Sequence, residues 1–247
     1  MTRQDVLAVI PVRWGSTRFP GKALADLSGL PLVEHVWRHA TAARSIGRVV
    51  VATDDERILA AVIGFGGEAI MTAADHPSGT DRVAEVALAT SCRIVVNIQG
   101  DEPLLDPEAM DAAVAPLLAD NDVEATTLAA PLARDDDVHD PHLVKVVTAA
   151  NGDALYFSRS PVPFHRNQEA EANFLHHIGL YAFRRELLEE FSKWPPGTLE
   201  CAEGLEQLRL LEHGRRLRVI LIRRAFPGID TPQDLARVAA LLRADTP

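Results

Sequence analysis

The stretch VLAVIPVRWGSTRFPGK, residues 6–22, joins an apolar run to a loop that contains three cations. The run is rich in β-branched residues, which is typical of a buried strand. Arg13, Arg18 and Lys22 follow within one short loop, together with two hydroxyl residues and two glycines. In open α/β sheets, the loop from the first strand to the first helix commonly binds phosphate groups. We therefore expect a local anion site in this loop.

Short β-branched runs alternate with amphipathic segments over the first part of the chain. The expected strands are VLAVIPV (6–12), RVVVATD (48–54), EAIMTA (68–73) and RIVVNIQGD (93–101), and the expected helices are PLVEHVWRHATAA (31–43), DERILAAVIGF (55–65) and TDRVAEVALAT (80–90). This rhythm predicts parallel βαβ units. The strands near residues 50 and 95 are apolar at successive positions, as in a sheet that helices cover on both faces. We therefore predict an α/β fold with a mostly parallel central sheet.

The loop at residues 13–22 does not match the glycine patterns of known phosphate loops. Gly15 and Gly21 are too sparse for a dinucleotide motif, and Lys22 is not followed by Ser or Thr as in a Walker motif. Side-chain charge must then contribute, because guanidinium groups engage phosphate oxygens in pairs and lysine supplies a mobile point charge. The alternative is a solvated surface loop with salt bridges.

Two aspartates follow expected strands, and the first of them is a candidate metal ligand. Asp101 ends the strand RIVVNIQGD, where its carboxylate offers the hard oxygen that Mg²⁺ prefers. A helix N-cap or a turn role is the alternative for Asp101. Asp230 precedes a helix that begins near Pro232, and helix N-capping is open for it. His76, which precedes the helix at 80–90, is expected to make a structural hydrogen bond.

The pattern changes after about residue 140. Asn151-Gly152 separates two strand-like runs in LVKVVTAANGDALYFS (143–158), which predicts a β-hairpin whose two central turn residues have positive φ. Further elements are expected as an extended run at 174–183, helical segments at 184–194 and 202–214, a strand at 217–224 and a helix at 231–244. Gly204 lies inside the helical segment 202–214, where glycine costs about 1 kcal/mol. We expect an α+β insertion on the main sheet.

Composition limits the class of protein. Lys and Arg total 25 against 35 Asp and Glu, which gives a net charge of −10 that repels nucleic acids and anionic membranes. Cys92 and Cys201 lack metal or redox spacing and are expected to be reduced. No apolar stretch reaches the length of a membrane span, and the first run is too short for a signal peptide. We expect a soluble cytoplasmic protein with no nucleic-acid or membrane partner.

Nine ordered blocks resemble those of the 3-deoxy-manno-octulosonate cytidylyltransferase (CMP-Kdo synthetase) family. They are IPVRWGSTRFPGKALADLSGLPL, ATDDERI, ADHPSGTDRVAEVA, VVNIQGDEPLL, VKVV, ALYFSRSPVPF, NFLHHIGLYAF, LEQLRLLEHG and GIDTPQDL. The resemblance extends from about residue 6 to residue 242. It implies a Rossmann-like nucleotide-diphospho-sugar transferase fold and the reaction of CTP with the sugar acid Kdo, which releases pyrophosphate. It also implies a homodimer and a role in lipopolysaccharide biosynthesis.

The resemblance also implies roles for individual residues. It implies catalytic roles for Lys22, Arg13, Asp101 and Asp230, the two aspartates being Mg²⁺ ligands. It implies CTP contacts by Arg13, Ser16, Arg18, Lys22, Ser78, Gly79, Arg82, Gln99 and Gly100. It implies contacts to Kdo by Gln99, Arg159, His177, Tyr181, Glu206 and Gln207.

The sequence has no internal repeat, low-complexity tract or clear linker, so we expect one continuous unit. A single nucleotidyltransferase domain over residues 1–247 is expected, with a CTP-binding portion over about 1–140. A sugar-binding and dimerisation portion is expected over about 141–228, and a closing helix over 229–247.

Rival functions remain open at this level. A cytidylyltransferase for a related acid sugar, such as 8-amino-Kdo or sialic acid, would share the same motifs. A nucleotide-binding regulator without catalysis would bind CTP but not turn it over. A structural oligomerisation module would leave the basic loop and the strand-end acids unexplained.

Overall fold

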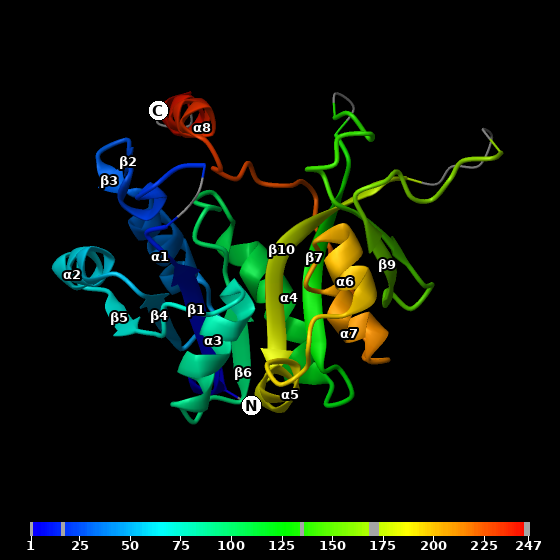
Figure 1. Cartoon of the computed structure of the whole chain (residues 1–247), viewed down its shortest axis with the longest axis horizontal. Coiled ribbons are helices and arrows are strands. Elements are labelled where there is room, and N and C mark those ends of the chain that lie inside the picture. Colours follow the sequence, from blue (N-terminus) through cyan, green and yellow to red (C-terminus); the bar gives the residue numbers. More distant parts are fainter. Residues whose placement is uncertain (1, 16–17, 134–135, 168–172, 245–247) are drawn as a thin grey trace. The chain divides into compact units, whose positions relative to one another are not determined.

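The computed structural model describes residues 2–15, 18–133, 136–167 and 173–244 and forms two compact units (Figure 1). The first unit comprises Met1–Asp111 and Phe226–Pro247, and the second comprises Ala112–Ala225. These units do not test the expected single functional domain over 1–247, which stays a prediction. In the described parts of the chain, no helix has both the length and the apolar character needed to cross a bilayer.

Strand β1 is central to the sheet of the first unit. It pairs in parallel with β4 on one side and β6 on the other, and β4 pairs in parallel with β5. Val9 of β1 lies opposite Val50 and Asn97, so the apolar run is covered along both edges as well as both faces. The strands are β1 (Val6–Val12), β4 (Arg48–Thr53), β5 (Glu68–Met71) and β6 (Ile94–Asn97). The predicted parallel sheet is confirmed.

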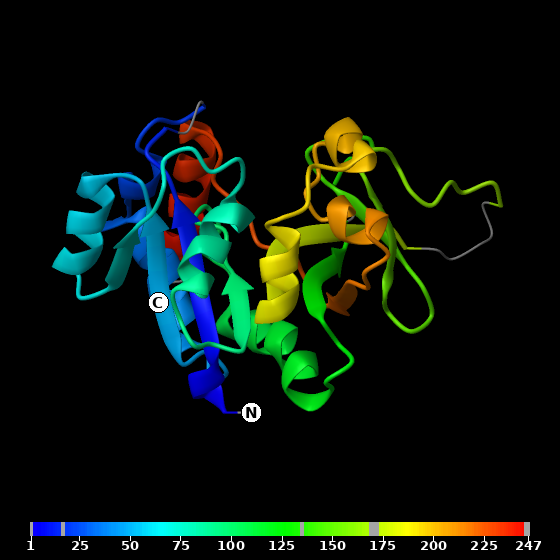
Figure 2. The same ribbon diagram turned by 60° about the horizontal axis from the view of Figure 1, so that its bottom comes forward.

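Three helices of the first unit pack against this sheet. Helix α3 packs on β1, α1 on β4 and β1, and α2 on β5 (Figure 2). Asp55 caps α2 by accepting a hydrogen bond from the Arg57 backbone N–H. The helices are α1 (Leu32–Ala42), α2 (Glu56–Gly64), α3 (Gly79–Leu88) and α8 (Pro232–Ala244), the last of which contacts β2. All four were expected.

Short elements in the first part of the chain were not expected. Strands β2 (Asp26–Leu27) and β3 (Leu30–Pro31) form a small hairpin. Its turn residues, Ser28 and Gly29, both have positive φ, as a two-residue turn requires. The remaining short elements are the 3₁₀ helices η1 (Arg3–Asp5) and η2 (Lys22–Leu24). Helix α4 (Pro107–Ala119) contributes residues to both units.

The second unit is mixed in strand direction, as expected of an α+β portion. Strand β10 pairs antiparallel with β7 and β8, β8 pairs antiparallel with β9, and β11 pairs in parallel with β7. The strands are β7 (Ala125–Pro131), β8 (Lys145–Thr148), β9 (Ala154–Ser158), β10 (Leu175–Arg184) and β11 (Arg218–Leu221). The helices are α5 (Arg185–Phe191), α6 (Thr198–Glu203) and α7 (Leu208–Glu212).

The predicted hairpin between β8 and β9 is present, but the predicted turn type is wrong. Gly152 has a φ of 85°, whereas Asn151 is not among the described residues with positive φ. The Gly152 backbone N–H donates to Ala149 O at 2.9 Å, and the Ala149 N–H donates to Asp153 O at 2.8 Å. This is a three-residue loop in which a type I turn precedes a left-handed glycine. Only one position therefore needs the conformational freedom of glycine.

The expected helix over 202–214 is interrupted, and the predicted cost of Gly204 is wrong. Helix α6 ends at Glu203, and Gly204 follows with a φ of 63° as its C-cap. Its N–H donates to Glu200 O. Glycine is favoured at this left-handed position because it has no Cβ. The residues between Gly204 and Leu208 consequently form a turn that joins two short helices.

Candidate active site

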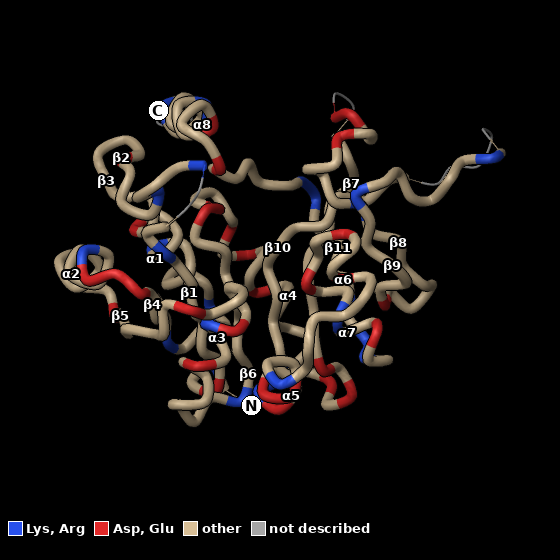
Figure 3. Tube along the Cα trace, viewed as in Figure 1, with Lys and Arg blue, Asp and Glu red and all other residues tan. Residues whose placement is uncertain are grey.

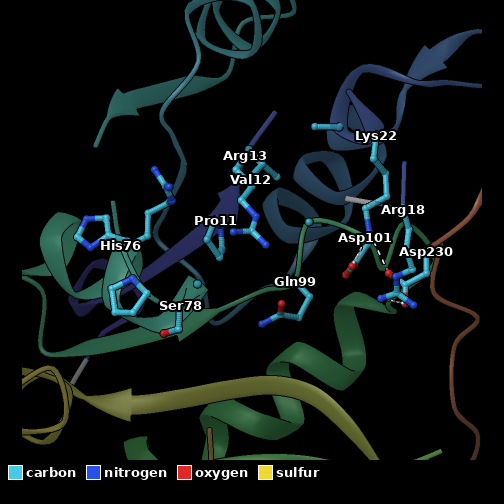
Figure 4. Close-up of a pocket in the computed structure, with 15 residues that line it drawn as sticks. Pro11, Val12, Arg13, Arg18, Lys22, His76, Ser78, Gln99, Asp101 and Asp230 are labelled. Carbon is cyan, nitrogen blue, oxygen red and sulfur yellow. Dashed lines mark hydrogen bonds and ion pairs between the residues drawn. The ribbon is translucent and has the colours of Figure 1, made fainter. Parts of the chain in front are cut away.

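The first unit contains a pocket of about 320 Å³ at the ends of β1 and β6 (Figure 4). Its walls come from the loop after β1, the start of α3, the loop after β6 and the residues before α8. The lining residues are Pro11, Val12, Arg13, Arg18, Lys22, Ala23, His76, Pro77, Ser78, Gly79, Arg82, Gln99, Gly100, Asp101 and Asp230. Every residue predicted to bind the nucleotide or the metal lines this pocket, except Ser16, which lies outside the described residues.

The pocket has two chemically different ends (Figure 4). Lys22 and Arg18 lie beside Asp101 and Asp230 at one end. His76 and Ser78 lie at the other end, with Arg13 and Gln99 between the two groups. Elsewhere, acidic and basic residues are spread along both units rather than gathered in one segment (Figure 3). The cations of the pocket are thus a local feature of an acidic chain.

The loop after β1 is folded back on itself, which directs Lys22 into the pocket. Gly21 has a φ of 72°, and its N–H donates to Trp14 O at 3.1 Å. A Cβ at Gly21 would lie 2.9 Å from the Trp14 ring, so both the backbone angle and the close packing require glycine. The Lys22 N–H donates to Phe19 O at 3.1 Å and begins the 3₁₀ turn η2.

The Lys22 ammonium lies between the two candidate metal ligands. Its Nζ is 2.8 Å from Asp101 Oδ2 and 3.2 Å from Asp230 Oδ1, and it also donates to Ile229 O at 2.8 Å. Arg18 adds an ion pair with Asp230 at 3.0 Å. The Lys22 side chain is only 14% exposed, whereas the two carboxylates are 34% and 50% exposed. The acids therefore face solvent and hold a cation between them.

A backbone contact brings the two aspartates together, although 128 positions separate them in the sequence. The Ile229 N–H donates to Asp101 O at 2.9 Å, which places the next residue, Asp230, beside Asp101. Thr231 and Asp234 form the N-terminal cap of α8, since each hydroxyl or carboxylate accepts from the other's backbone N–H. The alternative of N-capping by Asp230 is therefore wrong.

Asp101 is likewise not a helix cap. Asp106 takes that position at α4, where its Oδ1 accepts from the Glu108 N–H at 2.8 Å. The Asp101 carboxylate is left to interact with Lys22, and its backbone carbonyl is taken by Ile229. The structure consequently leaves both aspartate side chains available to a cation.

The two carboxylates fit a divalent ion that takes most of its ligands from a substrate. Asp101 and Asp230 both lie within 3.2 Å of a single cationic nitrogen, so their separation already suits a shared positive charge. Among the described residues, no cluster of three or more His, Cys, Asp or Glu is arranged to hold a metal. Mg²⁺ is commonly held by one or two carboxylates together with phosphate oxygens and water. These residues therefore fit Mg²⁺ better than a metal that needs a full protein cage.

Glu102 is a neighbouring acid that sequence reasoning did not single out. Burial, and then the charge of Asp101, raise the pKa of Glu102 to about 8. Its Oε2 is buried without a hydrogen-bond partner among the described residues. Glu102 is therefore mostly neutral at pH 7 and adds little negative charge beside Asp101. The only sequence signal is the adjacent Asp-Glu pair after a buried strand, which does not say which acid is buried.

The opposite end of the pocket is built on the start of α3. Ser78 is the N-cap, and its Oγ accepts from the Asp81 N–H at 3.2 Å. Gly79 approaches Pro11, and a Cβ at Gly100 would lie 2.3 Å from Val12. Glycine at position 100 therefore lets the loop after β6 lie directly against the end of β1. This end offers backbone N–H groups and the positive end of a helix dipole.

Arg82 and His76 line the pocket but are also bonded to neighbouring residues. Arg82 is 4% exposed, and its guanidinium donates to Thr72 Oγ1 and, at 3.0 Å, to Asp54 Oδ2. His76 Nε2 is hydrogen-bonded to Glu85, which matches the structural role expected for this histidine. The Arg82 bonds join the start of α3 to the ends of β4 and β5. Its direct contact with a nucleotide stays a prediction.

Gln99 is connected to the interior through a short chain of amide and hydroxyl groups. Its Nε2 donates to Asn97 Oδ1 at 3.4 Å, and Asn97 Nδ2 donates to Thr80 Oγ1 at 2.9 Å. Asn97 is fully buried at the end of β6. One amide N–H of Gln99 is used in this contact, so its second N–H and its carbonyl oxygen are left for a ligand.

The residues predicted to bind the sugar acid all lie in the second unit, except Gln99. His177 is buried, its Nε2 is 2.9 Å from Thr127 Oγ1, and burial lowers its pKa to about 3. Tyr181 contacts the His177 ring and donates its hydroxyl to Gln207 Oε1 at 3.1 Å. Arg159 donates to backbone carbonyls, and Glu206 lies on the turn before α7. The structure thus joins three of the predicted residues, His177, Tyr181 and Gln207, in one buried cluster.

Comparisons with known proteins support a cytidylyltransferase. The profile of a family described as Cytidylyltransferase matches residues 7–217. A 3-deoxy-manno-octulosonate cytidylyltransferase of Solibacter usitatus is 49% identical over 241 residues, which cover 98% of this chain and 96% of that protein. A protein of the same name from Geobacter sulfurreducens is 49% identical over 249 residues and covers 97% of this chain and 100% of its own length.

Solved structures agree with the fold. The structure of a CMP:2-keto-3-deoxy-manno-octonic acid synthetase complexed with CTP superposes with a TM-score of 0.93 at 43% identity, covering 97% of this chain and 99% of that one. A 4-diphosphocytidyl-2C-methyl-D-erythritol synthase from Anaerococcus prevotii has a TM-score of 0.65 at 14% identity, covering 96% and 98%. The second likeness concerns the fold alone.

Proposed function

Because the chain belongs to the 3-deoxy-manno-octulosonate cytidylyltransferase family, we propose that it joins CTP to Kdo and releases pyrophosphate for lipopolysaccharide biosynthesis. One observation of the structure carries the proposal. Lys22, Asp101 and Asp230 meet at one end of a pocket whose other end is the N-terminus of α3. A triphosphate needs cations and a metal site, and a nucleoside needs close backbone approach, so this pocket has the parts that CTP requires.

The cations of the loop after β1 are proposed to bind the triphosphate. Lys22 is held by Asp101 and Asp230, and Arg18 is held by Asp230. Phosphate oxygens can replace these carboxylates as partners of the same cations. Negative charge increases on the phosphates as the anomeric hydroxyl of Kdo attacks the α-phosphorus and pyrophosphate leaves. Lys22, Arg13 and Arg18 then stabilise that charge electrostatically.

Asp101 and Asp230 are proposed to hold Mg²⁺ once the nucleotide is bound. The ion would supply Lewis acidity at the α-phosphate and lower the pKa of the attacking hydroxyl. The chain's own contribution is to present two partly exposed carboxylates from separate loops beside the triphosphate cations.

The end of the pocket at α3 is proposed to bind the cytidine. Ser78 and Gly79 bring backbone N–H groups close to the ligand, and Gln99 lines the same pocket with an amide that can donate and accept. The preference for CTP over UTP is proposed from the family to which the chain belongs.

Properties implied by the family resemblance complete the proposal. Arg159, His177, Tyr181, Glu206 and Gln207 of the second unit are proposed to bind Kdo. The enzyme is proposed to be a cytoplasmic homodimer, and the free thiols of Cys92 and Cys201 agree with a reducing compartment.

The test is pyrophosphate release by the purified protein with CTP, Kdo and Mg²⁺, omitting each in turn. Release that needs all three supports the proposal, and release with UTP at the same rate would contradict the proposed base recognition. Replacing Kdo by 8-amino-Kdo or sialic acid separates the related enzymes. Binding of CTP without any release would identify a non-catalytic regulator instead.

A further inference from the structure

The turn between α6 and α7 carries an unsatisfied donor. Gln207 is 3% exposed, and its Oε1 accepts from Tyr181. Its Nε2 is buried without a partner among the described residues. Leaving a buried amide N–H unpaired is costly, so an acceptor such as a water molecule or a ligand oxygen is expected beside it. Gln207 therefore has a donor that a bound ligand can use.

Glu203, at the end of α6, fastens this turn to strand β9. Its Oε1 accepts from Ser158 Oγ at 2.7 Å, and its Oε2 accepts from the Arg159 backbone N–H at 2.9 Å. In return, Arg159 Nε donates to Glu203 O at 2.7 Å, and Arg159 NH2 donates to Gly204 O at 3.3 Å. The two residues thus bond each other's main chain. Gly204, the first residue of the turn, is fixed by two hydrogen bonds, one from Arg159 to its carbonyl and one from its N–H to Glu200 O.

Arg159 is itself fixed by further bonds. Its NH1 donates to Pro141 O at 2.7 Å. Lys145 is fully buried and donates to Arg159 O at 2.5 Å and to Asp140 O at 3.0 Å. A guanidinium has five N–H donors, and three of them are used in these backbone bonds, which leaves two for a carboxylate. Arg159 therefore supports the turn and still retains donors for an acid.

We propose that Glu203 is a positioning residue for the sugar acid, acting through Arg159 and the 204–207 turn. The inference rests on the proposed function, because it takes the sugar acid to be the ligand that Arg159 and Gln207 await. The carboxylate of Glu203 fixes the Arg159 backbone and the start of the turn together. Without it, the donors of Arg159 and Gln207 would lose their relative placement, although neither side chain is removed.

The test compares Glu203→Gln with Glu200→Gln. Glutamine keeps the size of Glu203 but loses the charge and one acceptor, so only one of the two donors can face a carbonyl oxygen and neither bond is charge-assisted. Glu200 lies in the same helix, is buried, and pairs with Arg209 at 2.7 Å and 2.5 Å, and within the described part of the chain it makes no hydrogen bond to β9. It therefore serves as a control for general weakening of α6.

For each variant, KM for Kdo, KM for CTP and kcat are measured, together with CTP affinity by calorimetry and the melting temperature. Glu203→Gln is expected to raise KM for Kdo by about tenfold while CTP affinity stays within about twofold, because one lost charged hydrogen bond typically has an effect of this size. Glu200→Gln is expected to lower the melting temperature without raising KM for Kdo. Ser158→Ala, which removes one donor to Glu203, is expected to give a smaller rise.

Several results would overturn the inference. An unchanged KM for Kdo in Glu203→Gln, or an equal rise in Glu200→Gln, would show that Glu203 has no specific positioning role. If Glu203→Gln does not fold, Ser158→Ala decides, and an unchanged KM for Kdo in that variant counts against the proposal. A wild-type protein that releases no pyrophosphate with Kdo would instead overturn the proposed function and this inference with it.

Discussion

Lys22 and Lys145 carry the same side chain into opposite surroundings, one in each unit. Lys22 is paired with two carboxylates that are 34% and 50% exposed and that solvent or a ligand can reach. Lys145 is fully buried and donates to two backbone carbonyls, and burial lowers its pKa. A ligand can replace the carboxylates that pair with Lys22. The carbonyls that accept from Lys145 belong to the main chain and cannot be replaced in this way.

The same contrast holds for the arginines around them. Arg18 pairs with the exposed Asp230 of the pocket, whereas Arg159 donates to three backbone carbonyls. The cationic side chains of the pocket in the first unit can therefore exchange their carboxylate partners for a ligand. The cationic side chains around the 204–207 turn instead fix the conformation of the backbone.

The largest effect is expected from Asp101→Asn, which removes an exchangeable charge without changing the size of the side chain. Turnover is expected to fall by about a hundredfold or more, because a lost electrostatic contribution at a reacting phosphate typically costs several kcal/mol. The fold should persist, since the backbone carbonyl of Asp101, not its side chain, bonds Ile229. Steady-state pyrophosphate release and circular dichroism provide the measurement. Near-normal turnover with unchanged Mg²⁺ dependence would contradict the proposed role of Asp101 as a metal ligand.

Lys145→Met tests whether the buried lysine stabilises the backbone of the second unit. The substitution leaves the carbonyl of Arg159 without its lysine donor, while the carbonyl of Asp140 keeps only the Leu143 N–H, so the free energy of unfolding is expected to fall by about 1–3 kcal/mol. Urea unfolding is the measurement. Lys193→Met is a matched control because Lys193 is exposed, and it should change the free energy of unfolding by less than about 0.5 kcal/mol. Equal losses in the two variants would contradict the role assigned to Lys145.

Lys22→Met tests whether the lysine of the pocket and a divalent ion compete for the same two carboxylates. In the absence of nucleotide, the Lys22 ammonium occupies the position between Asp101 and Asp230 that a divalent ion would share. Removing it is expected to tighten Mn²⁺ binding to the nucleotide-free protein by about tenfold, because Asp101 then loses its cationic partner and Asp230 keeps only its ion pair with Arg18. Electron paramagnetic resonance of free Mn²⁺ measures this affinity directly, without any turnover.

Adding Asp101→Asn to Lys22→Met provides the control for that experiment. The double variant should lose the gain in Mn²⁺ affinity, since one of the two carboxylates is neutralised. If Lys22→Met binds Mn²⁺ no more tightly than the wild-type protein, the lysine and the metal do not compete for these acids.

The parallel sheet and the pocket loops could be predicted because they depend on local patterns. β-Branched runs predict β1, β4 and β6, and the loops after parallel strands meet at one edge of a sheet. The approach of Asp101 and Asp230 depends instead on one long-range backbone bond from Ile229. No spacing in the sequence reveals such a bond, so only the family resemblance suggested that the two acids meet.

The details of the second unit were harder to predict for a related reason. Lys145 in a strand and Glu203 at a helix end are usually solvated residues, and their bonding partners come from segments distant in sequence. Gly204 was interpreted as a fault in a helix because the helix was expected to continue. In each case the tertiary partner, rather than local propensity, determines the role of the residue.

The smallest effect is expected in the pH dependence of stability, which tests whether His177 of the second unit is shielded from solvent. Burial lowers the pKa of His177 to about 3, so the folded protein keeps this ring neutral while the unfolded chain binds a proton below its ordinary value near 6.5. Stability is therefore complete above pH 6.5 and is lost as the pH falls towards 3. Between pH 7.5 and pH 6.0 the loss of stability from this one group is expected to be about 0.8 kcal/mol.

His177→Gln should remove that part of the pH dependence of the free energy of unfolding, measured with urea, whatever its effect on absolute stability. A slope identical to that of the wild-type protein would mean that the ring has the same pKa in the folded protein as in the unfolded chain, and that burial does not keep it neutral.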